Sequence, residues 1–184
     1  MSGESGFRVV PVTGRAAVAW VAKTHRHLPK VQGALFAAGV SHAGAVVGVA
    51  TAGNPPRVWQ GTGRFVITRV AALPGLKTVG QHAAPVCTML YRSLCDAGRA
   101  LGYAEAWTYT LPGEDGRSLR AAGFVYRGMT RAEDWDRPSR SRSKAEAIPK
   151  GRWMRPLTRA ARAKLFAELE AEAKAELETD RLAA

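Results

Sequence analysis

His25 and His27 form a His-x-His pair, an arrangement in this 184-residue chain that suggests chemistry by its spacing alone. Two imidazoles at this spacing can bind a metal ion, and a neutral imidazole can accept a proton from an attacking amine. A metal site needs a third protein ligand, and the sequence offers none close to the pair. The simpler interpretation is therefore that both histidines are solvated at the surface. The functional interpretation stays open as the alternative.

A basic segment at residues 137–164 is the second candidate. It holds ten lysines and arginines and one acid, in a chain whose formal net charge is +12. A positive field of this density attracts polyanions and speeds their encounter with the protein. The segment therefore predicts contact with nucleic acid, whereas a solvated, disordered linker is the alternative.

Between these candidates, a predicted strand, helix and strand are the elements that would position a ligand. Residues 65–70 are β-branched and aromatic, which predicts a strand. The apolar residues of 85–101 recur every three or four positions, which predicts a helix, and the alternation of 104–111 predicts a second strand. Strand, helix and strand in this order make parallel neighbours, and we expect a ligand site at the ends of these strands.

The remaining segments predict one mixed α/β domain with a helical extension. We expect an edge strand at 7–12, a helix capped by Thr13, a hairpin within 35–51, a short helix at 118–124, strands near 124–127 and 152–154, and a long helix over 156–182. Cys87 and Cys95 fall on one predicted helix, too far apart for a disulfide, and we expect both to be core thiols. No apolar window of about 18 residues and no signal peptide is found, so we expect a cytoplasmic protein.

The order of the predicted elements resembles that of the GNAT acyltransferase fold. Short blocks are also similar to a family of GNAT-related proteins from phages and mobile elements, which is grouped with the Mom-type enzymes that modify adenine in DNA. The blocks are residues 87–91, 100–103, 108–111 and 118–124, and Trp135 followed by 138–140. The resemblance implies a GNAT-like domain over residues 1–156, whose mixed sheet has splayed central parallel strands.

The resemblance implies an acyl donor, acetyl-CoA or a related compound. GNAT proteins bind the donor between the two splayed strands, and backbone amides of the following loop and helix hold its pyrophosphate. The glycine-rich sequence that usually forms this loop is absent, and a longer loop at 73–85 replaces it. The positions that would contact the donor are Arg69, Val70 and Ala71 on the first strand, and Val86, Cys87 and Thr88 at the start of the helix.

The resemblance also implies a proton donor for the leaving thiolate. Many GNAT enzymes use a tyrosine at the position that is Leu119 here, and the nearest hydroxyls are those of Ser118 and Tyr109. We expect one of them to protonate the thiolate, directly or through water. His27 would line the same centre, because GNAT proteins admit the acceptor near the end of the first helix. The structural alternatives are capping of the short helix for Ser118 and a core position for Tyr109.

A DNA base as acceptor requires a basic groove for the backbone and an aromatic ring for the flipped base. The candidates for substrate or DNA binding are His25, Trp135, Arg137, Arg140, Arg142 and Arg152, with Trp59 as a second ring. Ordinary core packing is the alternative for each tryptophan. No metal site is predicted.

The sequence thus leaves three functions open. The first is a Mom-like GNAT-fold enzyme that transfers an acyl-type group to DNA, with the adenine amine as acceptor. The second is a CoA-dependent N-acetyltransferase of a small amine or protein. The third is a DNA-binding protein that keeps the fold and has no catalytic activity. The acidic helix within 157–184 has two candidate partners, the chain's own basic segment and a second copy in a homodimer.

Overall fold

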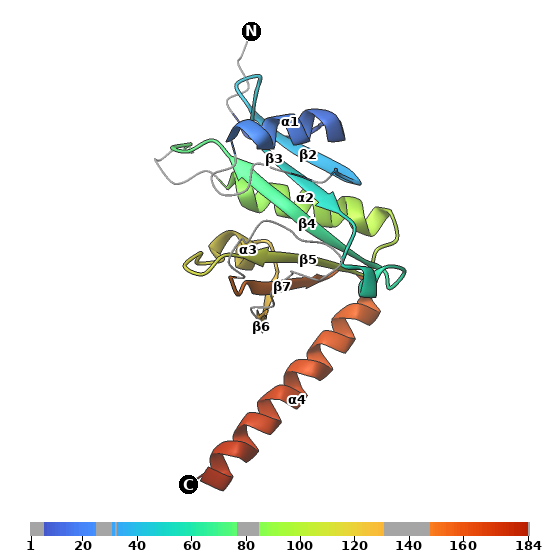
Figure 1. Cartoon of the computed structure of the whole chain (residues 1–184), viewed down its shortest axis with the longest axis vertical. Helices are drawn as coiled ribbons and strands as arrows, with labels where there is room; N and C mark the ends of the chain where they lie inside the picture. The colour runs from blue at the N-terminus through green and yellow to red at the C-terminus, as the bar shows by residue number, and fades with distance from the viewer. Residues whose placement is uncertain (1–5, 25–30, 32, 77–84, 131–147, 184) are drawn as a thin grey trace, which may run out of the picture.

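The computed structural model describes residues 6–24, 31, 33–76, 85–130 and 148–183. These residues form one sheet of seven strands in the spatial order β1-β2-β3-β4-β5-β7-β6 (Figure 1). Along the chain the strands are β1 (Arg8–Pro11), β2 (Phe36–His42), β3 (Ala45–Gly53), β4 (Arg64–Ala72), β5 (Glu105–Thr110), β6 (Val125–Met129) and β7 (Gly151–Pro156). β4 and β5 are parallel, and the other neighbouring pairs are antiparallel. The mixed sheet with a central parallel pair confirms the predicted fold class.

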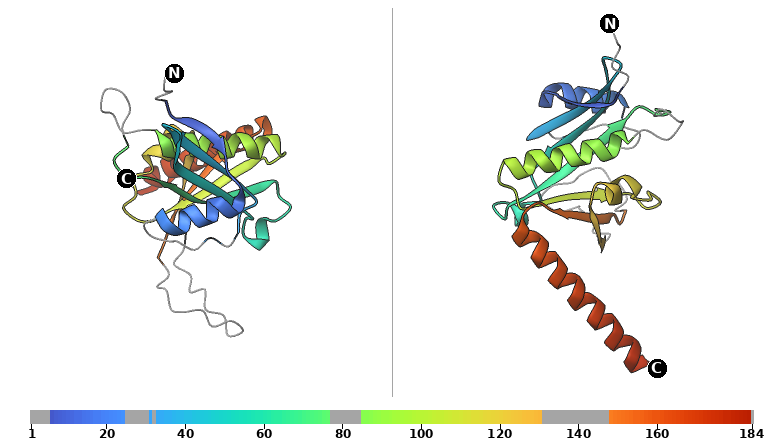
Figure 2. Two further views of the ribbon diagram at one scale, coloured as in Figure 1. Left: turned by 90° about the horizontal axis from the view of Figure 1, so that it is seen from above. Right: turned by 180° about the vertical axis from the view of Figure 1, so that it is seen from behind.

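Helices cover both faces of this sheet (Figure 2). They are α1 (Gly14–Thr24), α2 (Val86–Ala100), α3 (Arg117–Ala121) and α4 (Arg159–Ala183). On one face Val21 of α1 packs with Val49 of β3, and on the other Leu90 and Leu94 of α2 share a core with Phe65 of β4. The predicted order of strands and helices is confirmed for the described residues.

Signals in the sequence explain several of the helix boundaries. The Thr13 hydroxyl accepts a hydrogen bond from the amide of Ala16 at 3.2 Å, which confirms the predicted cap of α1. Gly102 follows the end of α2 and has a φ of 86°. This is the left-handed conformation in which glycine commonly ends a helix. α4 begins later than predicted, at Arg159, because β7 continues through Pro156.

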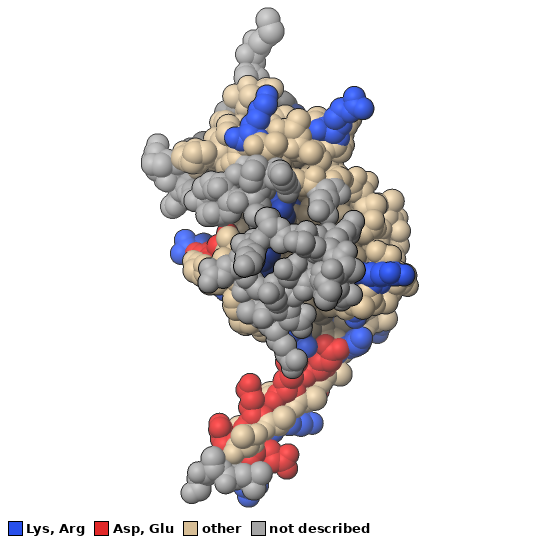
Figure 3. All heavy atoms as spheres, viewed as in Figure 1, with Lys and Arg blue, Asp and Glu red and all other residues tan. Residues whose placement is uncertain are grey.

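α4 has a packed beginning and an exposed remainder. Leu165 is only 3% exposed and joins Trp107 and Met154 in a small core. The side chains of 170–181 are exposed, and even Leu177 is 70% exposed. The helix points away from the sheet (Figure 1), and acidic side chains gather along it (Figure 3). A homodimer through this helix remains a prediction.

The two cysteines both lie on α2, as predicted. Cys95 is buried, and burial raises the pKa of its thiol to about 11, so the prediction of a core thiol is confirmed there. Cys87 is half-buried in the first turn of the helix, so it is not a core residue. In the described part of the chain, no helix has both the length and the apolar character needed to cross a membrane.

Candidate functional site

A cleft opens between β4 and β5. The two strands are paired at three positions, Arg64–Val66 against Glu105–Trp107, and then diverge. Just beyond, the Thr108 hydroxyl donates a hydrogen bond of 3.0 Å to the carbonyl of Ile67. The space beyond this contact has a volume of about 230 Å³. The predicted splay of the central parallel strands is therefore confirmed.

A β-bulge in β4 explains why the strands part at this point. Thr51 and Ala52 of β3 face Arg69 and Ile67 of β4, so Thr68 is an extra residue on β4. A bulge bends its strand and increases the local twist. The Thr68 hydroxyl donates to the carbonyl of Thr51 at 3.1 Å and lies 2.8 Å from the Thr51 hydroxyl. Since Thr51 is fully buried, these hydrogen bonds fix the bulge from inside the sheet.

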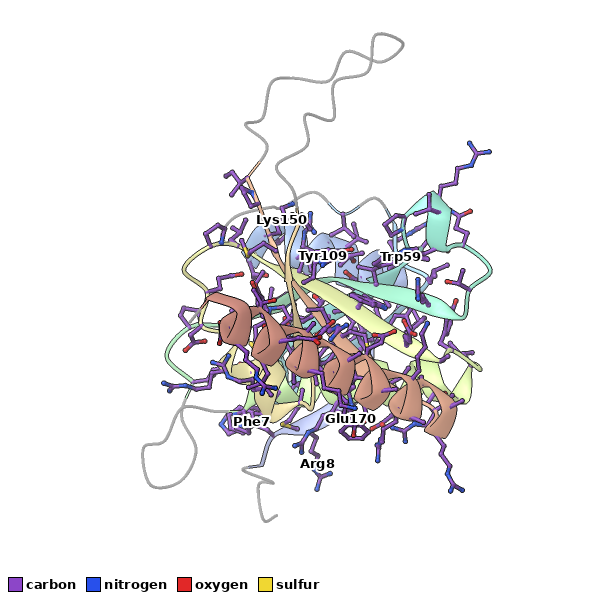
Figure 4. The ribbon with its side chains drawn as sticks, turned by 90° about the horizontal axis from the view of Figure 1, so that it is seen from below. Phe7, Arg8, Trp59, Tyr109, Lys150 and Glu170 are labelled. Atoms are coloured by element: carbon purple, nitrogen blue, oxygen red, sulfur yellow. The ribbon has the colours of Figure 1, made fainter. Side chains whose placement is uncertain are left out.

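Tyr109, one of the two hydroxyls predicted as a proton donor, lines the cleft. Its residue on β5 is directly opposite Arg152 on β7. Burial raises the pKa of Tyr109, and the positive charge of Arg152 opposes this shift. The hydroxyl therefore keeps its proton at neutral pH, beside a cation that would stabilise the phenolate. Figure 4 shows Tyr109 with Lys150 on one side and Trp59 on the other.

Tyr91 of α2 brings a second phenol to the cleft, which the sequence did not predict. A side-chain hydrogen bond joins it to Thr108, and burial raises the pKa of Tyr91 strongly. Its ring packs edge-on against Phe124 at 5.6 Å. In the sequence, Tyr91 directly follows Leu90, which belongs to the apolar stripe of this helix. A tyrosine at such a position also fits core packing, so this signal did not single it out as a site residue.

The predicted donor-binding residues divide between the cleft wall and the start of α2. Arg69 and Val70 line the cleft, whereas Ala71 is buried within β4. Burial lowers the pKa of Arg69, whose guanidinium donates to the carbonyl of Thr68 at 2.6 Å. Leu111, Glu114 and Lys150 also line the cleft.

The first turn of α2 offers backbone amides rather than side chains. Val86 is buried, and a Cβ added to Gly48 would lie 2.5 Å from its Cγ1, so the helix start sits directly on β3. The helical hydrogen bonds begin with the amide of Met89, which donates to the carbonyl of Pro85 at 2.9 Å. The amides before it precede the helical ladder, and this turn holds no acidic residue. An anion is therefore favoured at this helix end.

Ser118 lies away from the cleft wall. It is half-buried on α3, and its carbonyl accepts a hydrogen bond from the Thr88 hydroxyl at 3.4 Å. The capping alternative for Ser118 is wrong, because α3 begins one residue earlier and Asp115 accepts the amide hydrogen bond of Arg117 at 2.9 Å. Leu119 is buried in the core. Proton donation by Ser118 remains a prediction.

The other predicted residues lie outside the described part of the chain. They are His25, His27, Trp135, Arg137, Arg140 and Arg142. Among the described residues, no three His, Cys, Asp or Glu side chains come together as a metal site requires. Trp107 and Trp153 are buried, as core packing predicts, whereas Trp59 is half-buried.

A second hollow, the α4 groove, has a volume of about 530 Å³, and the sequence did not predict it. It lies between the sheet and α4 and includes Arg152, the cross-strand neighbour of Tyr109. Its lining residues are Trp59, Arg64, Trp107, Tyr126, Arg127, Gly128, Arg152, Glu168 and Glu172.

Several solved structures share the fold of this chain. No protein-family model and no curated protein matches the chain. The chain is similar to the structure of the ribosomal-protein-S18-alanine N-acetyltransferase from Escherichia coli, with 12% identity and a TM-score of 0.57 over 83% of this chain and 95% of that one. A phosphinothricin acetyltransferase from Sinorhizobium meliloti in complex with AcCoA gives 13% identity and a TM-score of 0.56, over 82% and 88% of the two chains. The polyamine N-acetyltransferase of Drosophila melanogaster has 12% sequence identity and a TM-score of 0.55, over 82% of this chain and 100% of that one.

These likenesses establish the GNAT fold. At such low identities they establish the fold alone, and the GNAT part of the resemblance is confirmed in that sense. None of the three structures is a Mom-type protein, so they give DNA modification no support.

Proposed function

We propose that this protein is an N-acetyltransferase that takes an acetyl group from acetyl-CoA, or a related acyl donor, and transfers it to an amine. The observation that carries the proposal is the cleft, where β4 and β5 part after three paired positions and enclose about 230 Å³ beside Tyr109. All three named neighbours are acetyltransferases, and one was solved with AcCoA.

The described residues fit such a donor. Where β4 and β5 diverge, β4 remains paired with β3 and β5 remains paired with β7. One backbone edge of each strand therefore faces the cleft. An extended amide-containing arm can hydrogen-bond to such edges as an added strand does. The amides of Val86, Cys87 and Thr88 would receive the pyrophosphate at the start of α2.

Tyr109 would be the proton donor of the reaction. The acceptor nitrogen attacks the thioester carbon, so that a C–N bond forms as the C–S bond breaks. The departing thiolate takes the proton of the Tyr109 hydroxyl, and the positive charge of Arg152 stabilises the resulting phenolate. The amine releases one proton, which passes through solvent to the phenolate and restores the phenol.

The test is acetyl transfer by the purified full-length chain. Titration calorimetry with acetyl-CoA, with ADP as a control for the nucleotide part alone, measures donor binding, and release of free CoA thiol in the presence of amines measures transfer. We expect saturable binding of acetyl-CoA and thiol release that depends on an added amine. Absence of donor binding would overturn the proposal.

Transfer to DNA remains the alternative acceptor chemistry. Most of its predicted residues lie outside the described part of the chain, and Arg152 and Trp59 are the two that lie within it. Nucleoside mass spectrometry of DNA incubated with the protein and acetyl-CoA tests it, and an unmodified adenine profile would remove this alternative.

A further inference from the structure

One hydrogen-bonding group of Arg152 has no partner among the described residues. This group is its Nε, which is buried. A buried donor without an acceptor destabilises a fold, so one that persists calls for an explanation. The rest of the guanidinium is held in place, because Nη2 donates to the carbonyl of Arg127 at 2.8 Å.

Several features of β6 and α4 hold Arg152 in this position. The pairing of β6 with β7 shifts between Tyr126 and Met129, and Gly128 has a φ of 80°, which turns the strand locally. The side chain of Arg127, only 13% exposed, lies 3.1 Å from Glu168 and 2.8 Å from Glu172. α4 therefore fixes Arg127, and the carbonyl of Arg127 fixes Arg152.

The three arginines that line the α4 groove differ in how the described residues match their charges. Arg64 is paired with Glu105 at 2.7 Å and lies over the rings of Trp59 and Trp107. Arg127 is paired with the two carboxylates of α4. No carboxylate of the described residues pairs with Arg152, the third arginine of this lining.

We infer that Arg152 binds a carboxylate carried by the acceptor beside its reacting amine, so that the acceptor is an amino acid or a compound with the same pair of groups. A carboxylate is planar and accepts two parallel hydrogen bonds from one edge of a guanidinium. Since Arg152 is directly opposite Tyr109, a carboxylate held there leaves the neighbouring amine at the cleft. The inference rests on the proposed acetyl transfer and names its substrate class.

Matched acceptors test this inference. Rates of thiol release from acetyl-CoA are measured with L-phenylalanine against L-phenylalaninamide, and with L-alanine against L-alaninamide, each normalised to the fraction of neutral amine. We expect the carboxylate member of a pair to have a kcat/KM at least about 10-fold above that of its amide, since a charged hydrogen bond is lost in the amide. Equal values for both members would overturn the inference while acetyl transfer itself stands.

Variants of Arg152 show whether that residue is the cause. Arg152→Gln should lower the carboxylate-to-amide ratio by about 10-fold or more, mainly through KM, and Arg152→Lys should restore part of it. Arg117→Gln is the matched control, because the side chain of Arg117 is 88% exposed and lines neither hollow. An unchanged ratio in Arg152→Gln would overturn the inference.

A binding measurement separates this inference from the proposed function. Ligand-observed NMR follows N-acetyl-L-phenylalanine and its carboxamide on the wild type and on Arg152→Gln, without any donor. Preferential binding of the carboxylate by the wild type alone supports the role of Arg152, even if no transfer is seen. Preference for inorganic phosphate or a short oligonucleotide over the carboxylate would overturn it in favour of a phosphate ligand.

Discussion

The cleft and the α4 groove adjoin at Tyr109 and Arg152 but are built in different ways. The cleft follows from the backbone, because a bulge at Thr68 parts two parallel strands and leaves their edges and hydroxyls facing each other. The groove follows from charged side chains that lie far apart in the sequence, with Arg127 held by two carboxylates of α4. We therefore propose that strand topology provides donor binding and that side chains and the added helix provide acceptor selectivity.

The largest expected effect separates the two phenols of the cleft. Tyr109→Phe should lower kcat by about 100-fold or more for every acceptor, because the thiolate loses its proton donor. Tyr91→Phe removes a hydrogen bond to Thr108 and should cost less than about 10-fold. Steady-state kinetics of both variants decide, and a larger loss in Tyr91→Phe would make Tyr91 the donor.

The pH dependence gives a second measure of the role of Tyr109. Because its pKa lies above the ordinary value, the phenol stays protonated beyond the usual range, and activity should fall only at strongly alkaline pH. Tyr109→Phe should lack this alkaline fall. A pH–kcat profile of both proteins is the measurement, and an identical alkaline limb in the variant would contradict the assignment.

A substitution under the start of α2 should break the cleft and spare the groove. The Cβ of Gly48→Ala would meet Val86 at 2.5 Å and the Ala71 carbonyl at 3.3 Å, which forces the helix start outward. We expect a loss of about 1–3 kcal/mol in unfolding free energy and a raised KM for acetyl-CoA. Gly6→Ala is the matched control, since nothing lies within 4 Å of its added Cβ.

Chemical denaturation and donor titration of these two variants provide the check. If Gly48→Ala kept the stability and the KM of the wild type, the close approach of α2 to β3 would be irrelevant to the site.

Removing the inner support of the bulge should have a smaller effect. Thr51→Val deletes the hydroxyl that lies 2.8 Å from that of Thr68, at a cost of about 1 kcal/mol in unfolding free energy. KM for acetyl-CoA should rise several-fold, with the carboxylate-to-amide ratio unchanged. Thr179→Val, at an exposed position of α4, is the control and should change neither quantity. A change in acceptor preference alone would contradict the division between the two hollows.

The smallest effect should come from shortening α4. Deleting residues 168–184 removes both carboxylates that hold Arg127, whereas deleting 173–184 keeps both and removes the exposed side chains of 173–181. The longer deletion should raise KM for L-phenylalanine about two- to five-fold without affecting its amide, since partly exposed ion pairs contribute little each. The shorter deletion should act as wild type. If the two deletion variants had the same KM for L-phenylalanine, α4 would have no role in acceptor binding.

Much of the fold and the presence of the cleft follow from local sequence patterns. The β-branched run at 65–70, the helical period of 85–101 and the order of elements are enough to predict a parallel pair with a site at its open end. The bulge is not predictable in this way, because it depends on how Thr51 and Thr68 meet across two strands. Tyr91 was missed because its spacing also fits core packing.

The α4 groove was beyond prediction for a different reason. Its formation requires Arg127 of β6 to meet Glu168 and Glu172, and no local pattern relates these segments. Arg152 was predicted as a substrate- or DNA-binding residue, and the lack of a partner for its Nε among the described residues became visible only in the structure. Ser118 was predicted as a proton donor because it is next to Leu119, the position of the tyrosine in many GNAT enzymes, and its capping alternative failed because the short helix begins at Arg117.

The most direct test of the central claim is a crystal structure of the protein grown with acetyl-CoA. The claim predicts that the arm of the donor lies between β4 and β5 beyond Val66 and Trp107, with its thioester next to Tyr109. A donor bound on another surface, or strands β4 and β5 paired along their whole length with nothing between them, would contradict it.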